Sequence, residues 1–126
     1  MSARPERLFV YGTLKRGQPN HHWLQSCPYE GEAIMAGLLL YDLGPFPMAV
    51  AGEGEVRGEV YALSRQELSS TDRFEGYPRL YDRCLRSLAD GRQTWVYVGR
   101  EHQVRHSPLL SEGIWHGRTD SEGRGR

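Results

Sequence analysis

One glutamate occupies a position that suits general acid or base chemistry. Glu75 lies seven residues after Leu68 on a predicted helix, a spacing that returns to almost the same angular position. Because Leu68 should anchor this helix to the core, the Glu75 carboxylate should face inward. Burial and the negative end of the helix dipole both raise the pKa of such a carboxyl, towards the range needed for proton transfer near neutral pH.

The alternative for Glu75 is a structural role, because ion-pair networks also perturb titration. Three arginines lie close enough in the sequence to pair with it: Arg73, Arg79 and Arg83. The other carboxylates considered, Glu53, Glu55 and Glu59, lie in a glycine-rich approach to a strand and are typical of a solvated face.

The segment YGTL, from Tyr11 to Leu14, offers a different kind of chemistry. A strand that stops at Gly12 and Thr13 can turn so that successive backbone amides converge on one point, which binds anions without a charged side chain. Such a concavity suits a carboxylate or a developing oxyanion. The GxxxxGK[ST] spacing of nucleotide phosphate loops is missing. An ordinary turn is the alternative for so short a motif.

Other residue types with chemical potential give weaker patterns. His21 and His22 are neighbours that point in different directions on a helix, and no matching Cys, Asp or Glu spacing accompanies them, so we expect no metal site. Nothing in the sequence lowers the pKa of the Cys27 thiol, which disfavours it as a nucleophile. Lys15, the only lysine, is either a solvated residue beside a turn or a group at the lip of a pocket.

The length, charge balance and cysteine content of the chain limit the class of protein. A chain of 126 residues is expected to form a single domain, over residues 1–117, followed by a disordered tail over residues 118–126. Lys plus Arg and Asp plus Glu both number 16, so no overall field favours nucleic acid. The N-terminus MSARPER lacks a long apolar segment, so we expect no signal peptide or membrane span and a cytoplasmic location. Cys27 and Cys84 should be small buried apolar side chains.

The elements that must position these residues are mostly strands. Apolar runs with β-branched and aromatic residues predict strands over residues 8–11, 33–41, 48–51, 56–63, 85–88 and 94–98. Gly37 should mark a kink in the second of them, and Asp90-Gly91 should form the turn between the last two. Along residues 56–62 the odd-numbered side chains should lie on one face and the even-numbered ones on the other.

Two helices are expected. Asn20 should cap a short helix that runs through Ser26. Ser64 and Glu67 form a capping box, which predicts a helix that begins after Ser64 and ends near Glu75, where Gly76 can adopt the left-handed conformation. With few long crossovers, these elements favour an α+β domain with a curved or closed mixed sheet.

Three segments in order, FVYGTLKRGQPNH, GEVYAL and DRFEGYPRLYDR, resemble the γ-glutamylcyclotransferase-like superfamily, and most closely its γ-glutamylamine cyclotransferase branch. The resemblance extends from about Leu8 to Trp115. It implies a small mixed β-barrel with a few flanking helices. The family's catalytic glutamate corresponds to Glu75, and its substrate-binding segment to Tyr11, Gly12, Thr13 and Leu14. Tyr81 matches a recurring Tyr-x-Arg element near the pocket.

The resemblance also implies a reaction. The α-amine of a γ-glutamyl compound attacks its own γ-carbonyl, which yields 5-oxoproline and a free amine, so no serine or cysteine nucleophile and no cofactor is required. The expected partner is therefore a small γ-glutamyl molecule, with neither nucleic acid nor membrane. Two alternatives stay open: a domain that binds carboxylates without catalysis, and an enzyme that releases a different amine. The amine's identity should depend on the pocket lip, at Pro45–Pro47 and near Trp115.

Overall fold

The computed structural model describes residues 3–117, so the predicted tail over residues 118–126 lies outside the described part of the chain. Within that part, the strands form a five-stranded sheet of order β2-β3-β1-β5-β4. The strands are β1 (Glu6–Val10), β2 (Tyr29–Asp42), β3 (Pro47–Leu63), β4 (Asp82–Ser87) and β5 (Gln93–Val98). One α-helix, α1 (Arg65–Glu75), and two 3-10 helices, η1 (His21–Leu24) and η2 (Glu101–Val104), complete the described elements.

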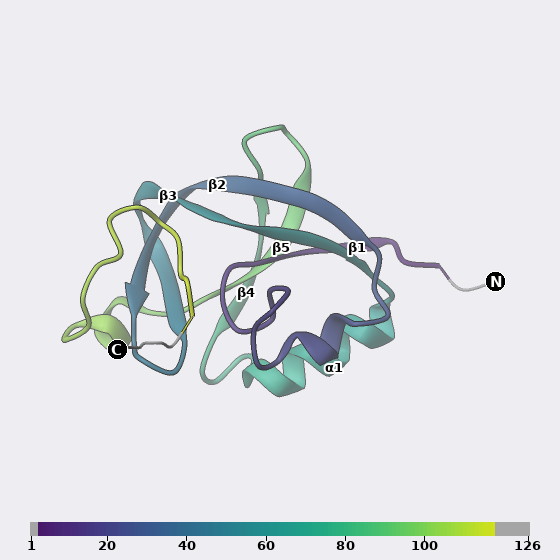
Figure 1. Cartoon of the computed structure of the whole chain (residues 1–126), viewed down its shortest axis with the longest axis horizontal. Helices are drawn as coiled ribbons and strands as arrows, with labels where there is room; N and C mark the ends of the chain where they lie inside the picture. Colours follow the sequence, from purple (N-terminus) through teal and green to yellow (C-terminus); the bar gives the residue numbers. More distant parts are fainter. Residues whose placement is uncertain (1–2, 118–126) are drawn as a thin grey trace.

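The sheet is mixed and curled. β1 pairs in parallel with β5 and antiparallel with β3, and the remaining pairs are antiparallel. The loop after β4 reaches the opposite edge of the sheet, where the Ala89 amide donates to the Ile34 carbonyl of β2 over 2.9 Å. Figure 1 shows the long β2–β3 ribbon arching over β1, with α1 below it. The predicted α+β class is confirmed, and the expected barrel takes the form of a curled half-barrel.

The prediction of separate strands at residues 48–51 and 56–63 is wrong, because both belong to β3. The glycines between them allow close packing rather than a loop. A Cβ on Gly54 would lie 2.8 Å from the Leu38 carbonyl oxygen, and one on Gly52 would lie 2.8 Å from Leu39 Cγ. Gly37 has a φ of +86° and coincides with a register shift in β2, as expected for a kink.

The prediction of an Asn20-capped helix through Ser26 is also wrong in part. Asn20 precedes η1, but its side chain makes no capping hydrogen bond, and the 3-10 helix ends at Leu24. Pro28 follows shortly afterwards and lacks the amide that a longer helix would need. The side chain of Asn20 is therefore free to serve another purpose.

The core consists of two clusters, one on each face of the sheet. Leu8, Tyr61 and Leu63 pack with Leu68 of α1 in the first cluster. Phe9, Val60 and Trp115 belong to the second cluster. The expected alternation along β3 holds from Val56 to Val60, but Tyr61 is also buried because α1 and η1 cover its face. The strand that carries the YGTL loop is thus fixed from both sides.

Candidate active site

Glu75 is positioned by a helix with well-defined ends. At its start, the Ser64 Oγ accepts from the Glu67 amide over 3.0 Å, and the Glu67 carboxylate accepts from the Ser64 amide over 2.8 Å. Arg4 also donates to Glu67 over 3.0 Å, and these hydrogen bonds lower the pKa of Glu67 to about 2. At its end, Gly76 adopts φ +75°, which makes Glu75 the last residue of α1. The predicted capping box and helix end are confirmed.

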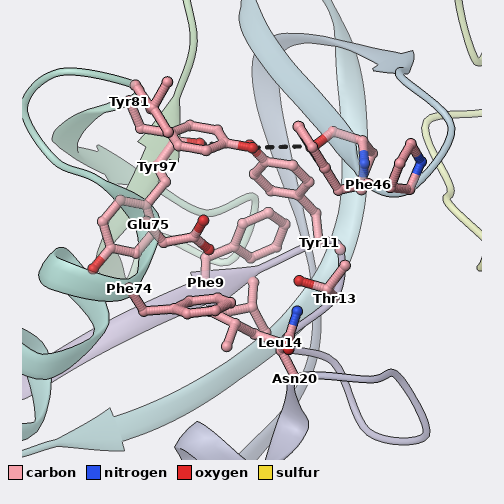
Figure 2. A pocket seen from close by; sticks show the side chains of 15 residues that line it. Phe9, Tyr11, Thr13, Leu14, Asn20, Phe46, Phe74, Glu75, Tyr81 and Tyr97 are labelled. Carbon is pink, nitrogen blue, oxygen red and sulfur yellow. Dashed lines mark hydrogen bonds between the residues drawn. The ribbon is translucent and has the colours of Figure 1, made fainter.

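A cavity of about 300 Å³ is lined by the predicted catalytic residue and by all the predicted substrate-binding residues. It lies between the end of β1 with its following loop (residues 9–14), the C-terminus of α1 and the β2–β3 turn. Tyr11, Gly12, Thr13 and Leu14 line one part of it, while Glu75 and Tyr81 line another. Figure 2 shows the Glu75 carboxylate pointing into the cavity, with the Thr13 hydroxyl and the Asn20 amide on the facing side. Residues far apart in the sequence therefore meet around one space.

The Glu75 carboxyl has no ionic partner within residues 3–117. Arg83, one of the three arginines considered for it, instead donates to Asp72 Oδ1 over 2.7 Å. Burial in the cavity raises the pKa of Glu75 to about 7, and no compensating charge opposes this shift. The structural ion pair is therefore not formed, and both protonation states of Glu75 are accessible near neutral pH.

The loop after β1 presents its backbone amides rather than charged side chains. Its carbonyls are engaged, because the Gly12 carbonyl accepts from the Lys15 amide and the Thr13 carbonyl from the Asn20 amide, both over 3.0 Å. The amides of Gly12, Thr13 and Leu14 donate to no acceptor within the part of the chain described. A Cβ on Gly12 would lie 2.8 Å from Pro47 Cδ, so only glycine fits there. This geometry leaves donors available for an anionic group.

The two tyrosines from the sequence motifs differ in what their hydroxyls can do. The Tyr11 hydroxyl donates to the Tyr97 carbonyl over 2.6 Å and accepts from the Ala49 amide over 3.1 Å. It is thus committed to tying the β1 loop to β5 and β3, and only its ring is offered to the cavity. The Tyr81 hydroxyl makes one long hydrogen bond of 3.4 Å to the Pro47 carbonyl. Burial raises the pKa of both phenols, which keeps them protonated.

A hydrogen-bond network beneath the cavity fixes the last turns of α1. The Tyr97 hydroxyl donates to Asp72 Oδ1 over 2.8 Å and lies 2.7 Å from Thr71 Oγ1. Arg83 adds its 2.7 Å hydrogen bond to the same Asp72 oxygen. β4 and β5 are thereby connected to the helical turn that carries Glu75. Sequence reasoning missed Tyr97 because its partners lie 25 and 26 residues away in the chain.

Four other residues considered in the sequence, namely Lys15, Trp115, His21 and His22, do not line this cavity. Lys15 points into a separate groove, where its Nζ donates to the Trp115 carbonyl over 2.8 Å. Trp115 itself is 2% exposed in the second core cluster, so it forms no part of the lip. His21 donates through Nδ1 to the Leu14 carbonyl over 2.9 Å, and His22 stacks on Trp23. Of the expected lip, only Pro45–Pro47 lines the cavity.

Among residues 3–117, no three His, Cys, Asp or Glu side chains are grouped as metal ligands. No helix within these residues is both long and apolar enough to cross a bilayer.

Asn20, Phe74 and Tyr97 also line the cavity but were not expected to do so. Phe74 precedes Glu75 and packs against Trp23 with ring centroids 5.2 Å apart. Asn20 was assigned to a helix cap, and the local sequence contains no signal for its actual orientation. Asn20 makes no side-chain capping hydrogen bond because the segment after it forms only one short 3-10 turn, and this could not be inferred from the local sequence.

Comparison with known proteins gives a consistent result. Residues 8–117 match the family described as "Gamma-glutamyl cyclotransferase, AIG2-like". A gamma-glutamylcyclotransferase family protein of Citrobacter rodentium is 36% identical over 109 residues, which cover 86% of this chain and 94% of that protein. Human gamma-glutamylaminecyclotransferase is 40% identical over 91 residues, which cover 62% of this chain and 58% of the human protein.

The fold agrees with the sequence comparison. The crystal structure of an AIG2-like protein from Mus musculus matches with a TM-score of 0.73 and 25% identity, over 91% of this chain and 97% of the mouse chain. The resemblance noted from the three sequence segments is therefore confirmed, and the chain belongs to the AIG2-like gamma-glutamyl cyclotransferase family.

Proposed function

We propose that the protein is an amine-releasing γ-glutamyl cyclotransferase in which Glu75 is the general acid and base. The observation that carries this proposal is the location of an unpaired, pKa-raised carboxyl in the same cavity as the free amides of the loop after β1. Family membership provides the reaction class. Tyr11, Gly12, Thr13, Leu14 and Tyr81 are proposed to contact the substrate.

The chemistry requires one proton acceptor that also returns the proton. The substrate's α-amine is mostly protonated near neutral pH and cannot attack in that form. Glu75 in its carboxylate form accepts a proton from this ammonium group, and the freed nitrogen attacks the γ-carbonyl carbon to close a five-membered ring. As the bond from that carbon to the amide nitrogen breaks, Glu75 returns the proton to the departing nitrogen. The ring nitrogen gives its second proton to the same departing nitrogen, so that the products are 5-oxoproline and the amine in its ammonium form, and Glu75 is again a carboxylate.

The loop after β1 is proposed to hold the negative part of the reacting molecule. The amides of Gly12, Thr13 and Leu14 can donate to the glutamyl α-carboxylate or to the oxyanion of the tetrahedral intermediate. Donors fixed by the backbone need no rearrangement during the reaction. Tyr81 stays protonated because burial raises its pKa, and its weakly bonded hydroxyl is a further neutral donor.

The competing function is a carboxylate-binding domain without catalysis, which the same amides would also support. The two are separated by incubating the purified protein with a panel of γ-glutamyl amides and measuring 5-oxoproline and free amine. The cyclotransferase proposal predicts both products in equal amounts. Recovery of every compound intact, together with measurable binding, would establish the binding domain instead.

A further inference from the structure

Within residues 3–117, consecutive carbonyls of the loop after β1 accept hydrogen bonds from backbone amides and from one side chain. The Gly12 and Thr13 carbonyls accept from backbone amides of the following segment, each over 3.0 Å. The Leu14 carbonyl accepts from Nδ1 of His21 over 2.9 Å. Because a carbonyl oxygen can only accept, Nδ1 is a protonated ring nitrogen in this contact. His21 is therefore the side chain that holds the loop from outside the cavity.

His21 is itself held against β3. Its ring centroid lies 5.6 Å from that of Tyr61, with an angle of 53° between the ring planes. Tyr61 is buried in the first core cluster. The Tyr61 hydroxyl donates over 2.9 Å to Glu59, and the Glu59 carboxylate also accepts from the Arg16 amide over 3.0 Å. The ring of His21 thus connects the loop to a buried residue of the sheet.

The carbonyl that His21 holds is linked to the cavity through the planar peptide groups of the loop. In a trans peptide group, the carbonyl and the following amide point in opposite directions. Fixing the Leu14 carbonyl therefore sets the direction of the Lys15 amide, which donates to the Gly12 carbonyl. The Gly12 carbonyl in turn sets the direction of the Thr13 amide. One side-chain hydrogen bond thus helps to orient a backbone donor of a residue that lines the cavity.

We propose that His21 is a positioning residue of the active site, which directs the amides of the loop after β1 towards the substrate anion without contacting the substrate. This inference depends on the proposed role of those amides as anion ligands. His21 does not line the cavity, so its effect passes through the Leu14 carbonyl. When that hydrogen bond is lost, the amides no longer converge on one point, and a small displacement of aligned groups costs a large factor in rate.

Two amide variants separate the Nδ1 donor from the other properties of the ring. Asparagine carries its amide nitrogen at the same number of bonds from Cα as histidine carries Nδ1, so His21→Asn keeps a donor for the Leu14 carbonyl. Glutamine is one methylene longer, so His21→Gln places its nitrogen beyond that position. His21→Phe also lacks the donor but keeps an aromatic ring against Tyr61. His22→Gln is the matched control, since His22 is an exposed neighbour that stacks on Trp23.

Two measurements on these variants test the assignment. We expect kcat/KM for the γ-glutamyl amide that the wild type converts fastest to fall by about tenfold or more in His21→Gln and His21→Phe. His21→Asn should stay within about threefold of wild type, and His22→Gln should match wild type. The dissociation constant for 5-oxoproline, measured by NMR titration, should follow the same order. Both measurements are made well below the unfolding temperature of every variant, so that a loss of stability alone cannot change the result.

The possible outcomes separate this inference from the cyclotransferase proposal. Wild-type kinetics and affinity in both His21→Gln and His21→Phe would overturn the inference and leave the reaction intact, and so would equal losses in His21→Asn and His21→Gln. If the wild type makes no 5-oxoproline but binds it, and binding weakens in His21→Gln and not in His21→Asn, only the cyclotransferase proposal fails. A wild-type protein that neither makes nor binds 5-oxoproline would overturn both.

Discussion

Thr13 and Glu75 face each other across one cavity, the first from the loop after β1 and the second from the last turn of α1 (Figure 2). Neither element alone forms the cavity, because each contributes only part of its lining. The capping box sets where α1 begins, Gly76 sets where it ends, and the Tyr97–Asp72 hydrogen bond holds its last turns against β5. The relation between the two residues is therefore a property of the whole fold.

Activity should depend on the ionisation of Glu75. Because burial raises the pKa of this carboxyl to about 7, the base form is lost as the pH falls below that value. A plot of kcat/KM against pH should rise on its acidic side with an apparent pKa near 7, followed by any change due to the substrate amine. Steady-state assays of 5-oxoproline across the pH range measure this. A flat acidic side down to pH 5 would exclude Glu75 as the base.

The same shift predicts how stability depends on pH. The folded pKa of about 7 exceeds the ordinary glutamate pKa of 4.5, so the folded state binds the proton more tightly than the unfolded state. Wild-type stability should therefore fall as the pH rises from about 4.5 to 7 through this group. Glu75→Gln removes the effect, and its unfolding temperature relative to wild type should be higher at pH 8 than at pH 5. If the difference in unfolding temperature between Glu75→Gln and wild type is the same at both pH values, Glu75 is not buried as described.

Gly12→Ala adds only one methyl group but should disrupt the loop after β1. The added Cβ would lie 2.8 Å from Pro47 Cδ and Cγ, so either the loop or the β2–β3 turn must shift. We expect KM for a γ-glutamyl amide to rise by about tenfold or more, because displaced amides no longer converge on the substrate anion. Gly17→Asn serves as the control, since Gly17 has φ +82°, which asparagine tolerates, and a Cβ there would meet no atom within 4 Å. Normal kinetics for Gly12→Ala would show that the loop amides are not substrate ligands.

Tyr97→Phe should loosen the turn that carries Glu75 without removing any group that touches the reacting atoms. Its hydroxyl donates to Asp72, which keeps its second hydrogen bond from Arg83. We expect a loss of about 1 kcal/mol in the free energy of unfolding. A positioning role further predicts that kcat falls while KM changes little. If unfolding is affected and kcat is not, Tyr97 is structural only.

Much of the candidate site could be predicted from the sequence because the features that indicate it are local. The capping box at Ser64, the left-handed Gly76 and the seven-residue spacing from Leu68 together determine the direction of Glu75. These are interactions within one helix and its ends, so they can be inferred without knowledge of the rest of the fold. The YGTL segment was identified by the same local reasoning.

What could not be predicted depends on contacts between distant segments. The glycines at positions 52 and 54 indicate a loop in isolation, whereas in the fold they lie within β3, where a Cβ at either position would clash with Leu38 or Leu39 of β2. Asn20 satisfies the rules for a helix cap, yet its side chain lines the cavity. The placement of Phe46 and Leu80 in one cavity is likewise set only by tertiary structure.

The most direct test of the central claim compares Glu75→Gln with wild type and with Glu53→Gln, which changes an exposed glutamate of β3. Each protein is mixed in excess with γ-glutamyl-isobutylamide, and 5-oxoproline is followed through a single turnover, so that slow product release cannot hide the chemical step. We predict that Glu75→Gln slows this step by about 100-fold or more while Glu53→Gln matches wild type. A Glu75→Gln variant that turns over at the wild-type rate would contradict the account.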